Sequence, residues 1–294
     1  MKERLVYNLI KLENLFLVEM SKLIVRLALD NEYKKIAEVF MASFFKEPVE
    51  PEKQELIISR IKKNIERKMP VYYVAVADDE IVGIGGETCY KGVSFIGYIG
   101  VLPKYRRRGI GNSIFERILD EAIKNNPTVE LFSNLGIENL YRKFGFEDEY
   151  YTHIFELKQF DTEIQLNVET LESKIPSWIY ELDKKAVGFD RSKLIDYLME
   201  EQDTKVITFK RNGYAICSGN QIGPMIAKNQ EAAKQIFDYL LSDGSKRVVS
   251  PERFKMFFEQ YKPNKIQTTL KMTFGEPIES IPDWIWSYSS FAFS

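Results

Sequence analysis

Three consecutive apolar strands, followed by an arginine- and glycine-rich segment and a helix, constrain the fold of this 294-residue sequence most strongly. The strands are expected at Val71–Ala77, Ile81–Tyr90 and Ser94–Val101, because apolar and β-branched residues run through each and short polar connections separate them. A helix is expected from about Asn112 to Lys124. A meander that leads into a helix predicts a mixed sheet with helices packed on it.

Helical and extended patterns on both sides of the meander complete an α/β unit. They predict strands at Leu23–Leu29, Val129–Ser133 and Tyr151–Leu157, and helices at Tyr33–Phe45, Glu52–Lys68 and Ile137–Phe144. In the helix Glu52–Lys68, we expect Leu56, Ile57, Ile61 and Ile65 to face inward. Apolar residues within Met1–Glu19 recur at roughly helical spacing, which indicates either a short amphipathic helix or a docking or frayed extension.

A similar alternation begins again at Thr162, after the polar segment Lys158–Asp161. Helices are expected near Ser177–Val187, Asp190–Glu201, Gln230–Leu241 and Pro251–Tyr261, and strands near Lys205–Lys210, Gly213–Cys217, Arg247–Val249 and Gln267–Phe274. We therefore predict an N-terminal extension at residues 1–20, one domain at 21–160 and a second at 161–294. The fold class is mixed α/β, with a mostly antiparallel sheet and helices on both of its faces.

The composition excludes several classes of function. Lysine and arginine total 41 against 43 acidic residues, so a formal charge of -2 provides no overall field for nucleic acid or an anionic membrane. The two cysteines and the single His153 do not have metal-ligand spacing, so we expect no metal site. No stretch approaches the roughly 20 apolar residues of a membrane span. We expect a cytoplasmic protein that does not bind membranes.

The pattern Arg106-x-x-Gly109-x-Gly111 lies between the third meander strand and the helix that follows it. Glycines allow the backbone to curl so that successive N–H groups, from Arg107 to Asn112, point into one concavity. The helix adds its positive N-terminal end, and Arg108 and its neighbours add charge. Such a concavity suits a pyrophosphate.

These residues resemble the GNAT family of acyl-CoA N-acyltransferases, in which a Q/R-x-x-G-x-G/A motif follows a strand and precedes a helix. Asn134 and the later run Leu140–Phe146 are similar to the family's second signature. The resemblance covers about half of the chain and implies an acetyltransferase that moves an acetyl group from acetyl-CoA to a primary amine. The acceptor would be a small molecule or a peptide.

The resemblance also implies roles for single residues. The cofactor-binding residues would be Ile99, Gly100, Val101, Arg106, Arg107, Arg108, Gly109, Ile110, Gly111, Asn112, Asn134 and Tyr141. Backbone groups of Ile99 and Val101 would bind the pantetheine arm, the amides of Arg107–Asn112 would hold the pyrophosphate, and Asn134 would lie near the pantetheine. Tyr141 would protonate the departing thiolate, or it would simply pack as an aromatic residue on its helix.

The general base is not assigned by the motif, because the strand Ser94–Tyr98 carries no carboxylate where many family members have a glutamate. Glu87 on the preceding strand is the candidate by position, and Tyr98 or a chain of waters are the alternatives. Because the glutamate is missing, the sequence also agrees with a protein that binds and senses acyl-CoA without catalysing a reaction. A nucleic-acid binder that uses Arg106–Arg108 is a second alternative, which the neutral composition disfavours.

The second half resembles the C-terminal domain of tandem-GNAT proteins that include the YitH-like group, through Ala186–Lys193 and Ile222–Ala227. It has no Arg-x-x-Gly-x-Gly, so the resemblance implies a GNAT-like domain without the cofactor loop. Such a domain would form one wall of the acceptor site or support a homodimer. Asp190, Arg191 and the aromatic tail Trp284–Tyr288 could contact the acceptor, or the tail could bury its tryptophans in the core.

Overall fold

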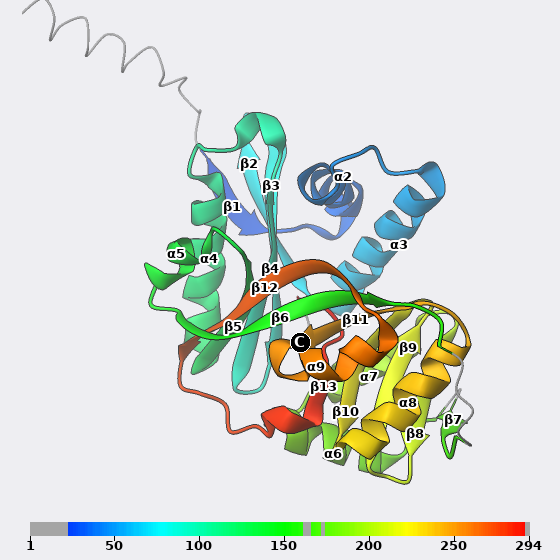
Figure 1. Cartoon of the computed structure of the whole chain (residues 1–294). Helices are drawn as coiled ribbons and strands as arrows, with labels where there is room; N and C mark the ends of the chain where they lie inside the picture. The colour runs from blue at the N-terminus through cyan, green and yellow to red at the C-terminus, as the bar shows by residue number, and fades with distance from the viewer. Residues whose placement is uncertain (1–22, 161–165, 172–173, 292–294) are drawn as a thin grey trace, which may run out of the picture. The chain divides into compact units, whose positions relative to one another are not determined.

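The computed structural model describes residues 23–160, 166–171 and 174–291 (Figure 1). The predicted N-terminal extension and its amphipathic helix lie outside the described residues. The chain divides into two compact units. The first unit contains the described residues up to Gly86 together with Tyr98–Ile118, and the second contains Glu87–Gly97 and the chain from Leu119 onward.

In the first unit, helices cover both faces of a sheet. Its elements are β1 (Ile24–Leu27), α2 (Tyr33–Phe44), α3 (Pro51–Arg67), β2 (Val71–Ala77), and parts of β3 (Glu80–Tyr90), β4 (Val93–Val101) and α4 (Ile110–Asn125). The strands follow the order β1-β2-β3-β4. Apolar residues of α2 and α3 pack on one face, around Val74 and Ile84. On the other face α4 lies directly on the sheet, since a Cβ atom at Gly85 would come within 2.6 Å of Ile114 and Ile118 side chains (Figure 1).

Helix α3 shows how the local sequence determines an element. Pro51 occupies the first helical turn, where its missing N–H costs nothing, and the helix ends at Lys68 in the left-handed region with φ 52°. Ile57 and Ile61 face the core as expected. The expectation for Leu56 is wrong, because its side chain is 70% exposed. Ile57 and Ile61 are four residues apart and share one stripe of the helix, whereas Leu56 is rotated about 100° away from that stripe.

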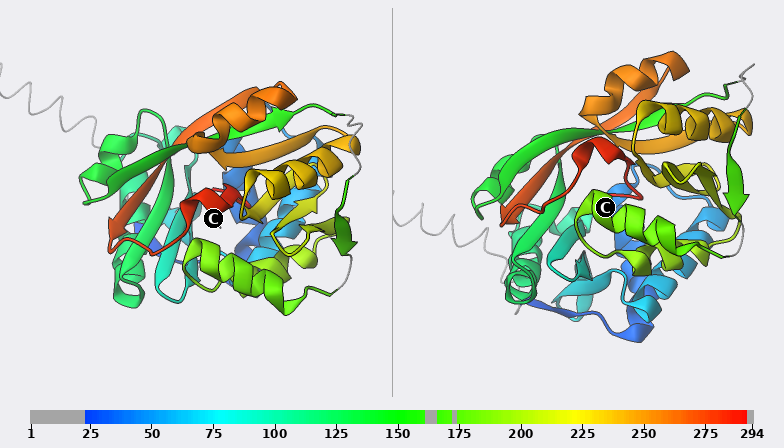
Figure 2. Two further views of the ribbon diagram at one scale, coloured as in Figure 1. Left: turned by 60° about the horizontal axis from the view of Figure 1, so that its bottom comes forward. Right: turned by 90° about the horizontal axis from the view of Figure 1, so that it is seen from below.

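The second unit holds a longer sheet with helices on it. Its further elements are β5 (Thr128–Asn134), α5 (Glu138–Arg142), β6 (Glu147–Leu157), β7 (Glu169–Leu171), α6 (Ser177–Val187), α7 (Ser192–Met199), β8 (Thr204–Phe209), β9 (Gly213–Ser218), β10 (Gln221–Ala227), α8 (Gln230–Ser242), β11 (Lys246–Pro251), α9 (Lys255–Phe258), β12 (Asn264–Gly275) and β13 (Ile285–Ser287). The strand order is β4-β5-β12-β6-β11-β10-β9-β8-β7, and β13 pairs with β10. The pairs β4–β5 and β10–β11 are parallel. Helix α8, in gold, and helix α6, in light green, lie on opposite sides of strands β8–β10 (Figure 2).

Strand β12 completes the sheet from the far end of the sequence. It pairs antiparallel with β5 and with β6, so that Leu270 lies opposite both Ser133 and Tyr151. The sequence pattern predicted this strand but not its partners. The predicted domain boundary between residues 160 and 161 stays a prediction, although β6 and β12 belong to one unit.

The core of the second unit is rich in aromatic residues. The Trp286 indole N–H donates to the Ala227 carbonyl at 3.0 Å, and its ring stacks on Phe254 with centroids 4.0 Å apart. The interpretation that the aromatic tail enters the core is therefore confirmed for Trp286, which is 4% exposed. The helix expected at Pro251–Tyr261 is shorter, because only Lys255–Phe258 is α-helical and 3-10 turns flank it.

A fully buried ion pair lies between α6 and α7. The Arg191 guanidinium donates from Nε and Nη2 to the two carboxylate oxygens of Asp183, at 2.8 Å each. The Tyr214 hydroxyl donates to the same carboxylate. Arg191 is only 1% exposed. Among the sequence candidates for an acceptor contact, Arg191 thus binds a structural partner, and Asp190 accepts a hydrogen bond from the Ser192 N–H at 2.9 Å.

Candidate active site

The segment between β4 and α4 forms an open backbone loop in the first unit. Arg107 and Gly109 both have positive φ, at 62° and 80°, and residues 106–109 are exposed. At such a φ glycine is favoured, although a Cβ atom at Gly109 would meet nothing within 4 Å. Helix α4 begins at Ile110, slightly earlier than expected, so Gly111 and Asn112 lie in its first turn. The two left-handed residues therefore fold the chain immediately before a helix N-terminus.

The backbone amides of this loop provide hydrogen-bond donors. Over the part of the chain that the structure describes, no acceptor takes the N–H groups of residues 107–112. The first amide to bond is that of Ser113, which donates to the Gly109 carbonyl at 3.0 Å. The first N–H groups of a helix carry partial positive charge, and several aimed at one place bind anions. The loop thus has the donors and the open space that a diphosphate group requires.

The Arg106 side chain braces the loop instead of pointing away from it. Its Nε donates to the Val101 carbonyl at 3.0 Å, and its Nη2 donates to the Ser43 carbonyl at the end of α2 at 3.2 Å. The Arg108 guanidinium lies 5.5 Å from the centre of the Tyr105 ring. Arg107 is exposed. Arg106 therefore fixes the shape of the loop, while Arg107 and Arg108 leave positive charge at its surface.

The last residues of β4 lead straight into this loop. A Cβ atom at Gly100 would lie 2.8 Å from the Ser43 Cβ, so the absence of a side chain lets α2 approach the strand. Tyr98, within β4, has φ 57° and lies against the rings of Phe40 and Tyr72, each with its centroid 5.8 Å away. A left-handed residue within a strand is typical of a β-bulge.

Asn134 and Tyr141 belong to the second unit. Asn134 is exposed at the end of β5, and its Oδ1 accepts a hydrogen bond from Gln267 Nε2 at 2.7 Å. Tyr141 lies on the short helix α5, 8% exposed, with its ring 6.3 Å from that of Phe146. Burial raises the pKa of the Tyr141 hydroxyl to about 12. The hydroxyl therefore stays protonated at physiological pH, which is the state that a general acid needs.

Glu87 is a buried carboxyl on the face of β3 that packs toward α4. Its Oε1 accepts a hydrogen bond from Ser94 Oγ at 2.7 Å, and Ser94 in turn accepts from Asn126 Nδ2 at 2.8 Å. Burial raises the pKa of Glu87, with a smaller contribution from the charge of Glu121, while the Ser94 hydrogen bond lowers it. A raised carboxyl pKa suits a group that takes up a proton near neutral pH.

Sequence reasoning missed one cluster, in which Glu130 of β5 meets Lys271 of β12. Both side chains are buried, and Lys271 Nζ lies 2.8 Å from Glu130 Oε1. The available signal was a charged residue placed between the apolar Val129 and Leu131 on a short strand. Lys271 could not be connected to Glu130 from the sequence, because their strands are far apart along the chain and pair only in the fold.

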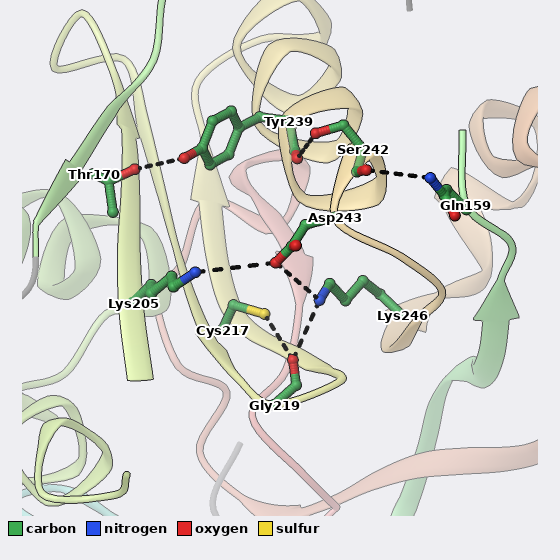
Figure 3. Close-up of polar contacts among 9 residues, drawn as sticks. All are labelled: Gln159, Thr170, Lys205, Cys217, Gly219, Tyr239, Ser242, Asp243 and Lys246. Carbon is green, nitrogen blue, oxygen red and sulfur yellow. Dashed lines mark hydrogen bonds and ion pairs between the residues drawn. The ribbon is translucent and has the colours of Figure 1, made fainter. Parts of the chain in front are cut away.

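Other reactive side chains have structural surroundings. The Cys217 thiol donates to the Gly219 carbonyl at 3.5 Å, beside Lys246 (Figure 3). Burial raises the pKa of this thiol, which keeps it from acting as a thiolate nucleophile. The His153 Nδ1 lies 2.9 Å from Thr268 Oγ1, and burial lowers the pKa of the ring. These contacts agree with packing roles for both residues.

Among the described residues, no group of three or more histidine, cysteine, aspartate or glutamate side chains is placed to hold a metal ion. In the same part of the chain, no helix is both long and apolar enough to cross a membrane.

Comparison with known proteins identifies both halves of the chain. A family model described as an acetyltransferase (GNAT) domain matches residues 69–148, and a second model with the same description matches residues 179–283. The first match contains the loop at Arg106–Asn112 as well as Asn134 and Tyr141. The chain therefore carries two GNAT acetyltransferase domains in tandem and belongs to the GNAT acetyltransferases. The YitH-like relation of the second half stays a prediction.

Individual relatives agree with this family. The acetyltransferase SG1711 of Sodalis glossinidius (strain morsitans) is 32% identical over 94 residues, which are 29% of this chain and 65% of that protein. The chain thus spans less than two thirds of the length of this curated relative. A proposed acetyltransferase from Pyrococcus horikoshii has a crystal structure with a TM-score of 0.85 and 27% identity, covering 94% of this chain and 97% of that one. A tandem GNAT protein from the clavulanic acid biosynthesis pathway has a TM-score of 0.54 at 10% identity over 87% and 99% of the two chains, and so shows the fold alone.

Proposed function

We propose that this protein is an N-acetyltransferase that transfers an acetyl group from acetyl-CoA to the primary amine of a small molecule or peptide. Membership of the GNAT acetyltransferases supports acyl transfer in general. The observation that carries the proposal is the row of N–H groups at residues 107–112, which find no acceptor in the described chain. The proposal also places the protein in the cytoplasm.

In this proposal the loop binds the diphosphate of the co-substrate. The amides of residues 107–112 donate hydrogen bonds to its oxygens, and Arg107 and Arg108 add positive charge. Backbone groups of Ile99 and Val101 bind the extended pantetheine arm as an added strand would. Bound acetyl-CoA supplies a thioester whose acetyl carbon is open to attack by an amine. Asn134 is assigned to the pantetheine by its place in the family's second signature.

The remaining residues move protons. During transfer a carbon–nitrogen bond forms, the carbon–sulfur bond breaks, the amine loses a proton and the thiolate gains one. Tyr141 is the proposed donor to the thiolate, and a backbone N–H near Val101 is the proposed donor to the thioester carbonyl oxygen. Glu87 is the proposed base, and its raised pKa supports that role. Tyr98 and a chain of waters are the alternatives.

The C-terminal GNAT domain has a different task in this proposal. It lacks the Arg-x-x-Gly-x-Gly sequence and is proposed to help bind the acceptor or to hold two copies together as a homodimer. Analytical ultracentrifugation would test the second role directly. A single sedimenting species at the monomer mass over a wide concentration range would exclude it.

A non-catalytic acyl-CoA sensor is the second candidate. It is favoured by one observation: the Glu87 carboxyl accepts a hydrogen bond from Ser94 in a buried position instead of facing open solvent. Release of free CoA thiol, followed with purified protein, acetyl-CoA and a panel of amines, distinguishes the two functions. The enzyme accelerates thiol release with at least one amine. Tight acetyl-CoA binding without turnover across the panel would instead establish the sensor.

A further inference from the structure

A cavity of about 210 Å³ lies wholly within the second unit. Its walls include the aromatic rings of Phe95, Phe189, Tyr150 and Tyr288, and its charged lining includes Glu130 and Lys271. Pockets for drug-sized ligands measure about 300–1,000 Å³, so this cavity fits a smaller molecule. None of its lining residues belongs to the loop at residues 107–112.

Once the pair Arg191–Asp183 is set aside, the carboxylates that line the cavity outnumber its cations. Lys271 Nζ lies 2.8 Å from Glu130 Oε1 and 3.0 Å from Glu149 Oε2. The other lining cation, Arg191, is already bound to Asp183 through two hydrogen bonds. Among the described residues that line the cavity, two carboxylates therefore share one ammonium group. Of the two, Glu130 is buried and Glu149 is exposed, so Glu130 is the carboxylate that gains most from a further cation beside it.

The hydrogen bonds identify which carboxylate has room for a ligand. Both oxygens of Glu149 are engaged, since Thr273 Oγ1 donates to Oε1 and Lys271 donates to Oε2. Glu130 is 4% exposed, yet its Oε2 accepts no hydrogen bond from any described residue. A carboxylate oxygen that accepts no hydrogen bond from the protein is open to a donor from a ligand. Glu130 Oε2 is thus the position at which a donor from a bound molecule would complete the site.

The walls suit the same kind of ligand. Aromatic faces attract cations, and sites for ammonium ligands are often built from several rings around a carboxylate. The Tyr150 and Tyr288 hydroxyls hydrogen-bond each other, which fixes both rings at the cavity. The Lys271 ammonium already lies 5.5 Å from the centre of the Tyr150 ring. The cavity therefore combines an unsatisfied carboxylate oxygen with aromatic and apolar walls.

We propose that this cavity binds a small primary ammonium ion, whose charged head donates to Glu130 Oε2 and whose hydrocarbon body lies against the rings of Phe95 and Phe189. The site goes beyond the proposed acetyl transfer, because binding here requires no acyl-CoA. Burial raises the pKa of Glu130 and the Lys271 charge lowers it. A bound ammonium group acts in the same direction as Lys271 and stabilises the ionised carboxylate.

Isothermal titration calorimetry of the full-length protein near neutral pH, without acetyl-CoA, tests the site. The probes are n-butylammonium, n-butanol and butyrate, which share a hydrocarbon body and differ in charge. We expect n-butylammonium to bind at least about tenfold more tightly than n-butanol, because a hydrogen bond to a charged group contributes about 1.4 kcal/mol or more. Butyrate should bind more weakly than either. Equal affinities for n-butylammonium and n-butanol, or no binding of n-butylammonium, would overturn the proposal.

Three variants locate the binding within the protein. Glu130→Gln keeps the shape of the side chain but removes its charge, and should weaken n-butylammonium binding by about tenfold or more. Glu156→Gln, an exposed carboxylate on β6, is the matched control and should leave binding unchanged. Ser280→Phe adds a ring to the cavity wall and should abolish binding. It tests the site independently, should Glu130→Gln fail to fold. Unchanged affinity in folded Glu130→Gln, or in Ser280→Phe, would contradict the proposal.

Discussion

Ser94 Oγ donates a hydrogen bond to Glu87 Oε1 over 2.7 Å, between the adjacent strands β4 and β3. This contact affects the pKa of Glu87, the candidate base. Burial raises the pKa of Glu87, and the Ser94 hydroxyl opposes part of that increase. The carboxyl thus connects the stability of the fold with the pH dependence of any reaction in which it serves as base.

Replacing Glu87 by glutamine should stabilise the fold at alkaline pH. The raised pKa means that the folded state holds this proton more firmly than the unfolded chain, whose carboxyl titrates near about 4.3. The contribution of Glu87 to stability is therefore complete below that value and is lost as the pH rises through the folded pKa. Urea unfolding of both proteins should show that the advantage of Glu87→Gln grows over this window. An advantage that does not change with pH would contradict the raised pKa.

The same substitution tests Glu87 as the catalytic base. We expect Glu87→Gln to lower kcat by about 10²-fold, a typical contribution of general base catalysis. Glu116→Gln, an exposed carboxylate on α4, is the control and should keep full activity. Ser94→Ala should shift the acid limb of the pH profile to higher pH, because the hydrogen bond that lowers the Glu87 pKa is gone. An unchanged kcat in Glu87→Gln would assign the role to Tyr98 or to water.

Tyr141→Phe should impair turnover without impairing co-substrate binding. The substitution removes only the hydroxyl, so we expect kcat to fall by about 10²–10⁴-fold, while the Kd for acetyl-CoA changes little. Because the pKa of Tyr141 is raised to about 12, wild-type activity should not decline through its ionisation below about pH 11. Tyr239→Phe, which loses a contact with Thr170, is the matched control (Figure 3). Full turnover in Tyr141→Phe would leave the residue with a packing role only.

The buried pair Arg191–Asp183 should contribute far more to stability than an exposed pair of the same geometry. Arg191→Met leaves the buried Asp183 carboxylate without its charged partner and should lower the free energy of unfolding by about 3–5 kcal/mol. Arg142 binds Asp148 through the same two nitrogens at the surface, and Arg142→Met should cost at most about 1 kcal/mol. Urea denaturation measures both. Equal losses would contradict the assigned burial of Arg191.

Local patterns predicted most elements of the fold but not their pairing. Helix α3 and the meander β2–β4 follow from apolar periodicity and short polar turns, which act within a few residues. Strand β12 pairs with β5 and β6 across more than 100 positions, and no local signal specifies such a partner. The sequence also left two positions open for Trp286, at the acceptor site or in the core. Only the stacking of its ring on Phe254 decides between them.

The candidate site was predictable to the extent that it depends on backbone chemistry. The glycines and their position before a helix indicated donors at residues 107–112, because that behaviour follows from local conformation. The bracing role of Arg106 was not predictable, since the Ser43 carbonyl comes from a distant helix. Glu130 and Lys271 were missed for the same reason: each is an isolated charge in an apolar strand until β5 and β12 are placed side by side.

The most direct test of the central claim is calorimetric titration of acetyl-CoA into the wild-type protein, Gly109→Ala and Gly92→Ala. Both glycines have positive φ, at 80° and 96°, and open space around them, so each alanine imposes a similar backbone cost of about 1–2 kcal/mol. Only Gly109 lies in the loop whose amides are assigned to the diphosphate. We expect wild type and Gly92→Ala to bind acetyl-CoA equally, and Gly109→Ala to bind it at least about tenfold more weakly. Absence of binding to the wild type, or equal binding by all three proteins, would contradict the account.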